Sequence, residues 1–506
     1  MARVARRSRH FALAAFFLAV AAAGAVAAAG APADVPRTLK LLRVEPVRGY
    51  AGTPFRIQGE GLASGNRVEI QWSTVDAGYV TRIRPDNVEY HERNYQEKRV
   101  PLGTATVDRN GRIDAALVAP EDFGEVHDIY AVVDGRDVAR GGFRILRSAS
   151  MSPLEGPVGT PITVTVKGLG WRGFEQFMAL RYDNRYSGEI SAVTTNGTAR
   201  FQIRAAGPAG RHFIQLNNST AYAPGAYLNT QQSPQDYIYA HLDNKQEFRF
   251  VFDVTRDAGP PPNTVQWPDG DRVARLESSA PRTAMSAGSA FPGSAALEPA
   301  SGPILSSTSL RARNLPPDTD VDVFFVTARG NRMGPSGWNL NHVPLARART
   351  AADGSLTASL RIPDDLGGWH AVTLASGDRV LAEVPYYVEQ MLVSTAPRRV
   401  KLGESFTVQI KGSGWTELDN TVAVTYDNAT LGYACGFNSD GDITINLLAT
   451  GHPGTHLIDI YPAIYKGLDR VPLNYQTPFL TFARDFPALA LGYRLPAYRL
   501  AIEVFE

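Results

Sequence analysis

Histidine is the first residue type to examine for chemistry, because its imidazole can transfer protons and bind metals near neutral pH. Four of the nine histidines recur at matched positions along the chain: His127, His212, His370 and His456. Each follows a glycine within three residues, where a turn is expected to lead into a strand. A metal site needs several converging ligands, and each copy supplies one histidine. A turn-stabilising role is therefore the stronger interpretation for all four.

Other catalytic patterns are missing from the sequence. It contains no His-Glu-x-x-His or Cys-x-x-Cys spacing, no Gly-x-Ser-x-Gly elbow and no phosphate- or dinucleotide-binding glycine loop. Cys435 is the only cysteine, so no intramolecular disulfide can form. Paired carboxylates for glycoside hydrolysis would come from separate strands and leave no spacing pattern. We predict no catalytic residues, no metal and no cofactor, and a polysaccharide-acting enzyme stays open as an alternative.

A Tyr-Asp-Asn triplet occurs twice, at 182–184 and 426–428. The tyrosine ends an apolar stretch, and Asp-Asn is a favourable pair for a hairpin turn. Loop carboxylate and amide oxygens also bind calcium, but one aspartate per loop supplies few ligands. The turn is the favoured interpretation, and calcium binding stays open.

Two groups of tyrosines lie beside asparagine and glutamine, a combination of flat apolar faces and polar rims that suits glycan or protein binding. The predicted binding residues are Tyr222, Tyr227, Tyr237 and Tyr239 in the first half, and Tyr461, Tyr465 and Tyr475 in the second. The alternative is that these rings fill gaps at the end of a folded domain. A further charged segment with several aromatic residues, 71–98, is expected to be an inserted partner-binding loop.

An internal repeat determines the elements that must position these residues. The residues Lys167, Gly168, Gly170 and Trp171 recur 244 positions later as Lys411, Gly412, Gly414 and Trp415. A second set, Pro120, Asp122, Gly124 and His127, recurs at offset 243 as Pro363, Asp365, Gly367 and His370. We expect Trp171 and Trp415 to be buried where a strand leaves its glycine turn. The chain thus contains a two-domain unit present twice.

The local pattern is that of β-structure. The segments 162–167 and 406–411 alternate apolar and polar residues, which indicates strands with one buried face. Short alternating strands between glycine, proline and asparagine turns predict an all-β chain of four tandem immunoglobulin-like β-sandwiches. Their expected limits are 38–147 (sandwich A), 148–256 (B), 301–388 (C) and 389–506 (D), with A resembling C and B resembling D. The proline-rich segment 257–300 is expected to be a linker.

One motif resembles a known family. Pro153, Gly156 and the Gly159-Thr160-Pro161 turn, followed by an alternating strand and Gly168-Leu169-Gly170-Trp171, look like the start of bacterial immunoglobulin-like domains of the IPT/TIG type. The resemblance covers most of B and D and the front of A, whereas C lacks the Gly-Thr-Pro turn. It implies a sandwich fold in an exported cell-envelope protein, and it leaves the function open.

The N-terminus reads as an export leader. Four arginines precede an uncharged apolar run, 11–30, and Ala31-Pro32-Ala33 offers a cleavage site; an uncleaved membrane anchor is the alternative. Without residues 1–33 the 51 basic residues fall to 47 against 50 acidic ones, a balance that argues against nucleic acid as a partner. The expected location is periplasmic, cell-surface or extracellular, without a membrane span after cleavage.

These observations favour an exported, non-catalytic binding or scaffold protein with an unidentified envelope glycan or protein as its partner. A polysaccharide-acting enzyme, or an accessory module of one, is the first alternative. A structural envelope protein that self-associates through strand edges is the second.

Overall fold

The computed structural model describes residues 39–506 apart from 173–175, 221–222, 227–247, 271–272, 274–282, 287–288, 331–337, 395–396, 437 and 466–475. Lys40–Glu506 forms one compact unit. Apart from one 3-10 helix, η1 (Pro487–Leu491), the named elements of the described residues are β-strands. The predicted all-β fold class is therefore confirmed. The predicted leader, 1–33, lies outside the described residues.

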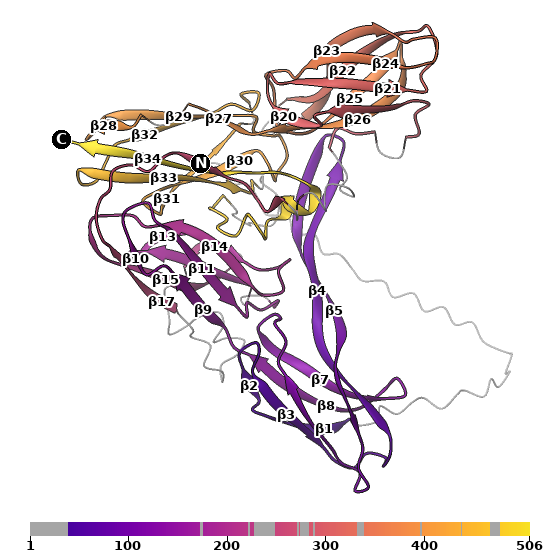
Figure 1. The fold of residues 1–506 in the computed structure, drawn as a ribbon, viewed down its shortest axis with the longest axis vertical. Coiled ribbons are helices and arrows are strands. Elements are labelled where there is room, and N and C mark those ends of the chain that lie inside the picture. Colours follow the sequence, from indigo (N-terminus) through magenta and orange to yellow (C-terminus); the bar gives the residue numbers. More distant parts are fainter. Residues whose placement is uncertain are drawn as a thin grey trace, which may run out of the picture. The chain divides into compact units, whose positions relative to one another are not determined.

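One strand order occurs four times (Figure 1). Numbered within each set, strands 1, 3 and 6 form one sheet, and strands 2, 8, 7, 4 and 5 form the other, with strand 2 parallel to strand 8. The second set has an additional strand, β16 (Ala223–Ala226), so β17 (Phe248–Val254) takes the place of strand 8 there. This interleaving of early and late strands is that of an immunoglobulin-like sandwich. In sandwich A the first strand pairs with both the third and the eighth, which joins its two sheets.

The four sets have the following strands. Sandwich A comprises β1 (Lys40–Glu45), β2 (Arg48–Gly49), β3 (Pro54–Gly59), β4 (Arg67–Arg84), β5 (Asn87–Thr106), β6 (Ile113–Val118), β7 (Glu125–Val133) and β8 (Arg136–Ile145). Sandwich B comprises β9 (Ser148–Ser152), β10 (Glu155–Gly156), β11 (Pro161–Lys167), β12 (Phe177–Tyr182), β13 (Arg185–Ser191), β14 (Ala199–Arg204), β15 (Gly210–Thr220), β16 (Ala223–Ala226) and β17 (Phe248–Val254). Sandwich C comprises β19 (Ser294–Glu298), β20 (Ser301–Pro303), β21 (Ser307–Arg313), β22 (Asp320–Gly330), β23 (Trp338–Arg349), β24 (Leu356–Arg361), β25 (Gly368–Ser376) and β26 (Arg379–Glu389). Sandwich D comprises β27 (Met391–Ser394), β28 (Arg399–Lys401), β29 (Ser405–Lys411), β30 (Thr421–Tyr426), β31 (Ala429–Cys435), β32 (Ile443–Leu448), β33 (Gly454–Ala463) and β34 (Ala497–Phe505).

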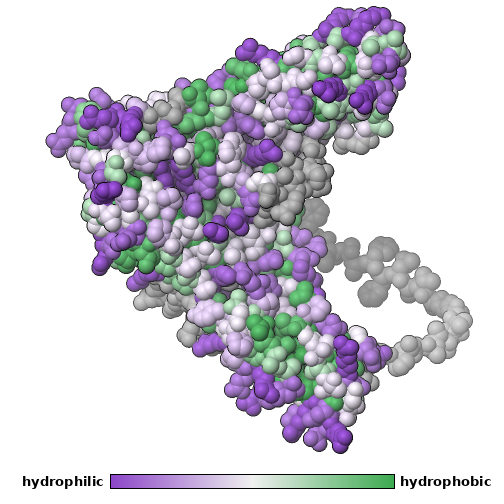
Figure 2. All heavy atoms as spheres, in the orientation of Figure 1, coloured by the Kyte–Doolittle hydropathy of each residue, from purple (hydrophilic) through white to green (hydrophobic). Residues whose placement is uncertain are grey.

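Alternation builds the sandwich cores. In β3, Phe55 and Ile57 are buried while Arg56 and Gln58 are exposed, because successive side chains of a strand point to opposite faces. Sandwich D departs from this rule, since every residue of β30 is buried. The central strands of its larger sheet, β30, β33 and β34, are thus covered on both faces. On the face shown in Figure 2, apolar residues form separate patches among hydrophilic ones.

The segment expected to be a linker, 257–300, contains two strands. β18 (Thr264–Gln266) pairs with β34 and so extends the larger sheet of sandwich D, and β19 is the first strand of sandwich C. Proline-rich composition predicts the absence of regular structure but misses a three-residue strand that pairs with a distant partner.

The segment 71–98 is not an inserted loop. β4 and β5 form a hairpin of 18 and 20 residues, which Figure 1 shows as a long two-stranded ribbon. Residues 67–72 and 100–106 belong to sandwich A, and the rest continues the same ladder past it. The aromatic residues expected on a loop, such as Trp72, Tyr79, Tyr90 and Tyr95, lie on these two strands instead.

Candidate functional site

Two of the matched histidines lie at junctions between sandwiches, His127 in the first repeated unit and His370 in the second. The ring centroid of His127 lies 4.9 Å from that of Trp171, and the ring centroid of His370 lies 4.9 Å from that of Trp415. The histidine belongs to the first sandwich of the unit and the tryptophan to the second. The repeated residues of the two offsets therefore meet across the A–B and C–D junctions.

The ring nitrogens of these histidines face backbone carbonyls. Nδ1 of His370 lies 2.9 Å from Val326 O, and Nε2 lies 2.9 Å from Leu366 O; His127 contacts two carbonyl oxygens in the same way. Burial lowers the pKa of both histidines. Neither nitrogen is left for a metal or a substrate, which agrees with the structural interpretation.

Glycines allow the backbones to meet at these junctions. A Cβ on Gly124 would collide with the carbonyl oxygen of Gly168, and a Cβ on Gly367 would collide with that of Gly412. Gly124 N donates to Leu169 O at 3.0 Å, and Gly367 N donates to Ser413 O, also at 3.0 Å. The repeated glycines thus fix how the second sandwich of each unit continues from the first.

The other two histidines bind the Tyr-Asp-Asn turns. Nδ1 of His212 lies 2.6 Å from Asp183 Oδ2, and Nδ1 of His456 lies 2.5 Å from Asp427 Oδ2. Asp183 and Asp427 have φ angles of 49° and 47°, left-handed values that Asp and Asn tolerate in tight turns. The turn interpretation of the triplets is therefore the one that the geometry supports.

These His-Asp pairs lack the arrangement of a proton relay. Nε2 of His212 lies 2.8 Å from Pro208 O, and Nε2 of His456 lies 2.8 Å from His452 O. A catalytic histidine must direct that nitrogen at a nucleophile or a substrate. Both rings are instead held between a carboxylate and a carbonyl.

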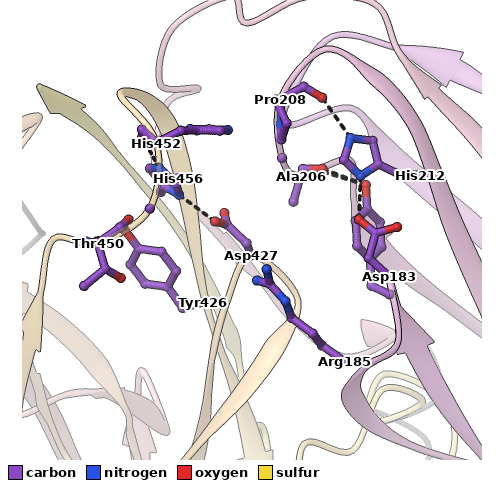
Figure 3. Close-up of a pocket in the computed structure, with 13 residues that line it drawn as sticks. Asp183, Arg185, Ala206, Pro208, His212, Tyr426, Asp427, Thr450, His452 and His456 are labelled. Atoms are coloured by element: carbon purple, nitrogen blue, oxygen red, sulfur yellow. Dashed lines mark hydrogen bonds and ion pairs between the residues drawn. The ribbon is translucent and has the colours of Figure 1, made fainter.

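The His212–Asp183 pair and the His456–Asp427 pair face each other across a pocket of about 340 Å³ (Figure 3). It is lined by matched residues of sandwiches B and D: Tyr182 and Tyr426, Asp183 and Asp427, His212 and His456. The tyrosine hydroxyls donate to Ala206 O and Thr450 O, each at 2.8 Å. The remaining lining includes Arg185 and His452, and this pocket is the candidate functional site.

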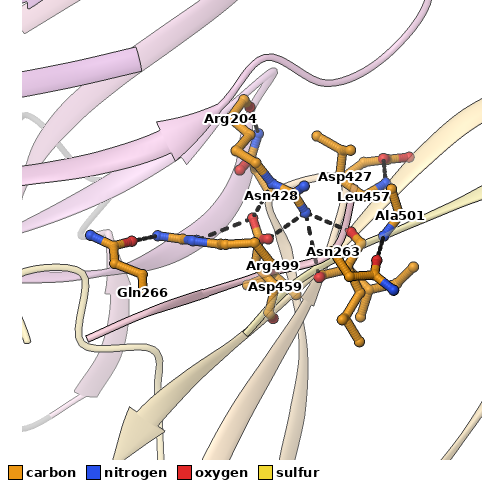
Figure 4. A network of polar contacts seen from close by, with 12 residues as sticks. Arg204, Asn263, Gln266, Asp427, Asn428, Leu457, Asp459, Arg499 and Ala501 are labelled. Carbon is orange, nitrogen blue, oxygen red and sulfur yellow. Dashed lines mark hydrogen bonds and ion pairs between the residues drawn. The ribbon is translucent and has the colours of Figure 1, made fainter. Parts of the chain in front are cut away.

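A buried charge network joins sandwiches B and D beside the pocket (Figure 4). Arg204 Nη2 lies 2.5 Å from Asp459 Oδ1 and donates to Leu500 O at 2.6 Å. Arg499 lies 3.3 Å from the other oxygen of Asp459 and donates to Gln266 of β18 at 2.8 Å. Both arginines and the aspartate are less than a tenth exposed, so each charge depends on its partners.

A second contact between B and D uses one carboxylate. Asp485, which is 1% exposed, accepts hydrogen bonds from the backbone N–H of Val193 at 2.8 Å and of Thr194 at 2.9 Å. Glu189 N donates to Pro478 O at 2.9 Å. The chain between β33 and β34 thus lies along the edge strand β13.

The tip of the β4–β5 hairpin binds sandwich D. Trp415 Nε1 donates to Asp86 O at 3.0 Å, and Tyr90 N donates to Glu417 Oε2 at 2.7 Å. Glu417 N in turn donates to Val88 O at 3.3 Å. Val88 and Tyr90 are at most 1% exposed, so the tip occupies a buried position within the chain rather than a free binding surface.

The predicted binding tyrosines fall into three groups. Tyr222, Tyr227, Tyr237, Tyr239 and Tyr475 lie outside the described residues. Tyr461 is 1% exposed, and its hydroxyl accepts a hydrogen bond from Arg499 at 2.5 Å; this corrects the expectation that it faces a ligand. Tyr465 is partly buried. Sequence periodicity could not identify Tyr461 as internal, because the outer face of its sheet is covered by distant parts of the chain.

The repeated tryptophans differ in burial. Trp415 is fully buried, as expected, but its apolar neighbours are residues of sandwich C such as Leu366 and Ala371. Trp171 is only partly buried, which corrects the expectation for that copy. Both rings serve a junction rather than the core of their own sandwich.

Two further properties bear on function. Among the described residues, no group of three or more His, Cys, Asp or Glu side chains is placed to hold a metal ion. Within the same residues, no helix has the length and hydrophobicity needed to span a bilayer.

Comparisons with known proteins give distant likenesses. No family of known proteins matches the sequence, and no curated protein matches it. A solved structure of Salmonella alpha-2-macroglobulin reacted with methylamine is 10% identical, with a TM-score of 0.18; the alignment covers 92% of this chain and 31% of that one. The D1–D4 ectodomain fragment of ICAM-5 is 11% identical over 92% of this chain and 100% of that one, with a TM-score of 0.19. Murine CEACAM1b is 11% identical over 33% of this chain and 91% of that one, with a TM-score of 0.13.

The chain therefore spans about a third of the alpha-2-macroglobulin chain that it matches. None of these likenesses is close enough to transfer a function. The immunoglobulin-like sandwich is established by the strand order of this chain.

Proposed function

We propose that this protein is an exported, non-catalytic binding scaffold of the bacterial cell envelope or surface, built from sandwiches of the IPT/TIG type. The observation that carries the proposal is that the four matched histidines form contacts within the chain. Both ring nitrogens of all four matched histidines face acceptors within the chain. They hold turns and junctions, so the residue types best suited to chemistry are used for structure.

The contacts of sandwich D with sandwiches A and B support a scaffold role. The buried pairing of Arg204 with Asp459 and the insertion of Tyr90 beside Glu417 join residues from the two halves of the sequence. A protein held in this way presents its loops in fixed relation, which reduces the entropy lost on binding a large partner. The IPT/TIG-type turn at 159–161 and the export leader favour the envelope as the place of action.

Binding to envelope material tests the proposal. The mature chain, 34–506, would be incubated with cell-wall glycans and with solubilised envelope from the source bacterium, and retained material would be quantified. We expect saturable retention of one envelope fraction and weaker retention after alanine substitution at Tyr227 and Tyr475. Substitution of His370, which serves the C–D junction and lies outside the pocket, is the matched control and should change stability more than retention.

Two results would favour the alternatives. Release of reducing ends from an envelope polysaccharide, lost on substitution of a single carboxylate, would identify an enzyme. Concentration-dependent assembly of the purified chain in sedimentation experiments, without retention of any envelope fraction, would identify a self-associating structural protein.

A further inference from the structure

We propose that the pocket between sandwiches B and D binds a small oxyanionic ligand, a carboxylate- or phosphate-bearing molecule of about monosaccharide size. The proposal goes beyond the scaffold function, because it concerns a site that the histidine turns build themselves. The pocket volume of about 340 Å³ lies within the range of small-molecule sites.

The acidic groups of the pocket are already engaged. Asp183 accepts hydrogen bonds from the ring of His212 and, at 2.8 Å, from Phe213 N. Asp427 likewise accepts hydrogen bonds from the ring of His456 and, at 2.9 Å, from Leu457 N. Each carboxylate therefore has a donor on both oxygens, one of them an imidazole, so that part of its acceptor capacity is used within the chain.

Asp257 is the acidic group of the preceding chain that approaches this region. It accepts hydrogen bonds from the backbone N–H and the hydroxyl of Thr455, at 2.7 Å and 2.6 Å. Its charge is thus directed at a turn of sandwich D, where burial alone would raise its pKa but the hydrogen bonds of Thr455 and, to a smaller extent, the charge of His452 lower it.

The basic groups of the pocket have capacity left. Arg185 lines the pocket from the start of β13 with an exposed side chain, and it forms no ion pair with a described residue. Nδ1 of His452 is buried and makes no hydrogen bond to any described residue, and the ring is tilted by 46° to that of His456 at a centroid distance of 4.8 Å. Figure 3 shows Arg185 extending toward the turn that carries Asp427. The basic groups of the pocket that no pocket carboxylate binds are therefore the exposed guanidinium of Arg185 and the partly buried imidazole of His452.

Arg185 and His452 are not among the residues that the two halves of the chain share. At offset 244, Arg185 corresponds to Ala429, and His452 corresponds to Pro208. The matched Tyr, Asp, Gly and His residues build the turns in both sandwiches, so neither Arg185 nor His452 is required for the turn itself. Both departures face the same pocket. Charge-assisted hydrogen bonds from a guanidinium and an imidazole suit the oxygens of a carboxylate or a phosphate.

Titration calorimetry on the mature chain tests this inference with defined probes. Glucuronate supplies a carboxylate on a sugar, inorganic phosphate supplies the other oxyanion, and glucose is the neutral control. We expect glucuronate or phosphate to bind in a salt-sensitive manner and glucose not to bind. The stronger of the two identifies the oxyanion. Equal binding of glucose, or no heat from either anion at millimolar concentration, would overturn the proposal whatever the envelope-binding result.

The repeat also supplies the substitutions. Arg185→Ala and His452→Pro each introduce the residue that the other copy carries at that position, and each should weaken binding of the preferred anion about tenfold, or roughly 1.4 kcal/mol. Arg211→Thr removes a charge from the same sandwich, copies Thr455 and lies in an exposed ion pair with Asp253; it should leave binding unchanged. If His452→Pro lowers the melting temperature, His452→Gln replaces it. Unchanged affinity in the two pocket variants, or an equal loss in Arg211→Thr, would contradict the site.

Discussion

Gly367 of sandwich C faces the carbonyl oxygen of Gly412 of sandwich D so closely that the position has no room for a Cβ. The same relationship joins Gly124 to Gly168 in the first half of the chain. Two glycines that look like turn residues in sequence therefore set the approach of two backbones.

Alanine at Gly367 or Gly124 should destabilise the chain, because the junction must open to accept the methyl group. We expect a loss of about 1–3 kcal/mol or more in the free energy of unfolding, measured by denaturant titration. A methyl group added at Gly78 of β4 would meet no other atom within 4 Å, so Gly78→Ala is the control. A junction variant as stable as that control would show that the two backbones can separate without cost.

Trp415 and Trp171 should differ in their contribution to stability although they occupy matched positions. Trp415→Ala removes a fully buried indole and should cost about 3–5 kcal/mol. Trp171→Ala should cost clearly less, because that ring is partly exposed. Denaturant unfolding of the two variants gives the comparison directly. Equal losses would mean that burial does not distinguish the junctions.

Asp459 should be the most sensitive residue of the buried network. Asp459→Ala leaves Arg204 and Arg499 buried without their counter-ion, which should cost about 3–5 kcal/mol. Arg204→Ala should cost less, because Arg499 still lies 3.3 Å from the carboxylate. Asp253→Ala, which breaks an exposed pair with Arg211, should cost less than about 1 kcal/mol. The ranking is measured by thermal and denaturant unfolding, and a loss at Asp459 no larger than that of Asp253 would refute it.

Glu417 should hold the tip of the β4–β5 hairpin. Glu417→Ala removes the acceptor of Tyr90 N, so residues 78–95 should be cleaved faster in limited proteolysis followed by mass spectrometry. The control is Glu503→Ala, which removes a surface partner of Arg399 and should leave the cleavage pattern unchanged. Unaltered protection of the hairpin in Glu417→Ala would place its stability elsewhere.

The pH dependence of stability should carry a contribution from His456. Burial by itself would lower its pKa, but the hydrogen bond and charge of Asp427, with smaller effects of the His452 carbonyl and Asp257, raise the pKa above its usual value. The folded state then binds the proton more tightly than the unfolded state. The resulting stabilisation is fully present below the unfolded pKa of about 6.5 and is lost as the pH rises through the folded value.

The difference in unfolding free energy between the unsubstituted chain and His456→Gln should therefore shrink from mildly acidic to mildly alkaline pH. His370 supplies a comparison of opposite sign, because burial lowers its pKa and its contribution is lost as the pH falls. Denaturant titrations across this range measure both. A constant or growing difference for His456→Gln would contradict the role of Asp427.

The candidate site was only partly predictable. The Tyr-Asp-Asn triplets and the Gly-x-His segments are visible as repeats, and turn chemistry explains each one locally. Their meeting across a pocket is not visible in the sequence, because Asp183 and Asp427 lie in different sandwiches and are 244 positions apart. The difference between Arg185 and Ala429 is visible when the two halves of the sequence are aligned, but the position of Arg185 at the pocket depends on the tertiary structure.

What the sequence alone determines is the local order of this protein. Period-two alternation in β3 or β29, turn residues between strands and a fixed repeat offset are enough to predict an all-β chain of repeated sandwiches, because these properties depend on neighbours along the chain. The tertiary structure decides which surfaces are covered: Tyr461 becomes internal, β18 joins sandwich D, and the β4–β5 hairpin binds Glu417. These outcomes depend on pairings between residues hundreds of positions apart, such as Arg204 with Asp459, for which alternation carries no information.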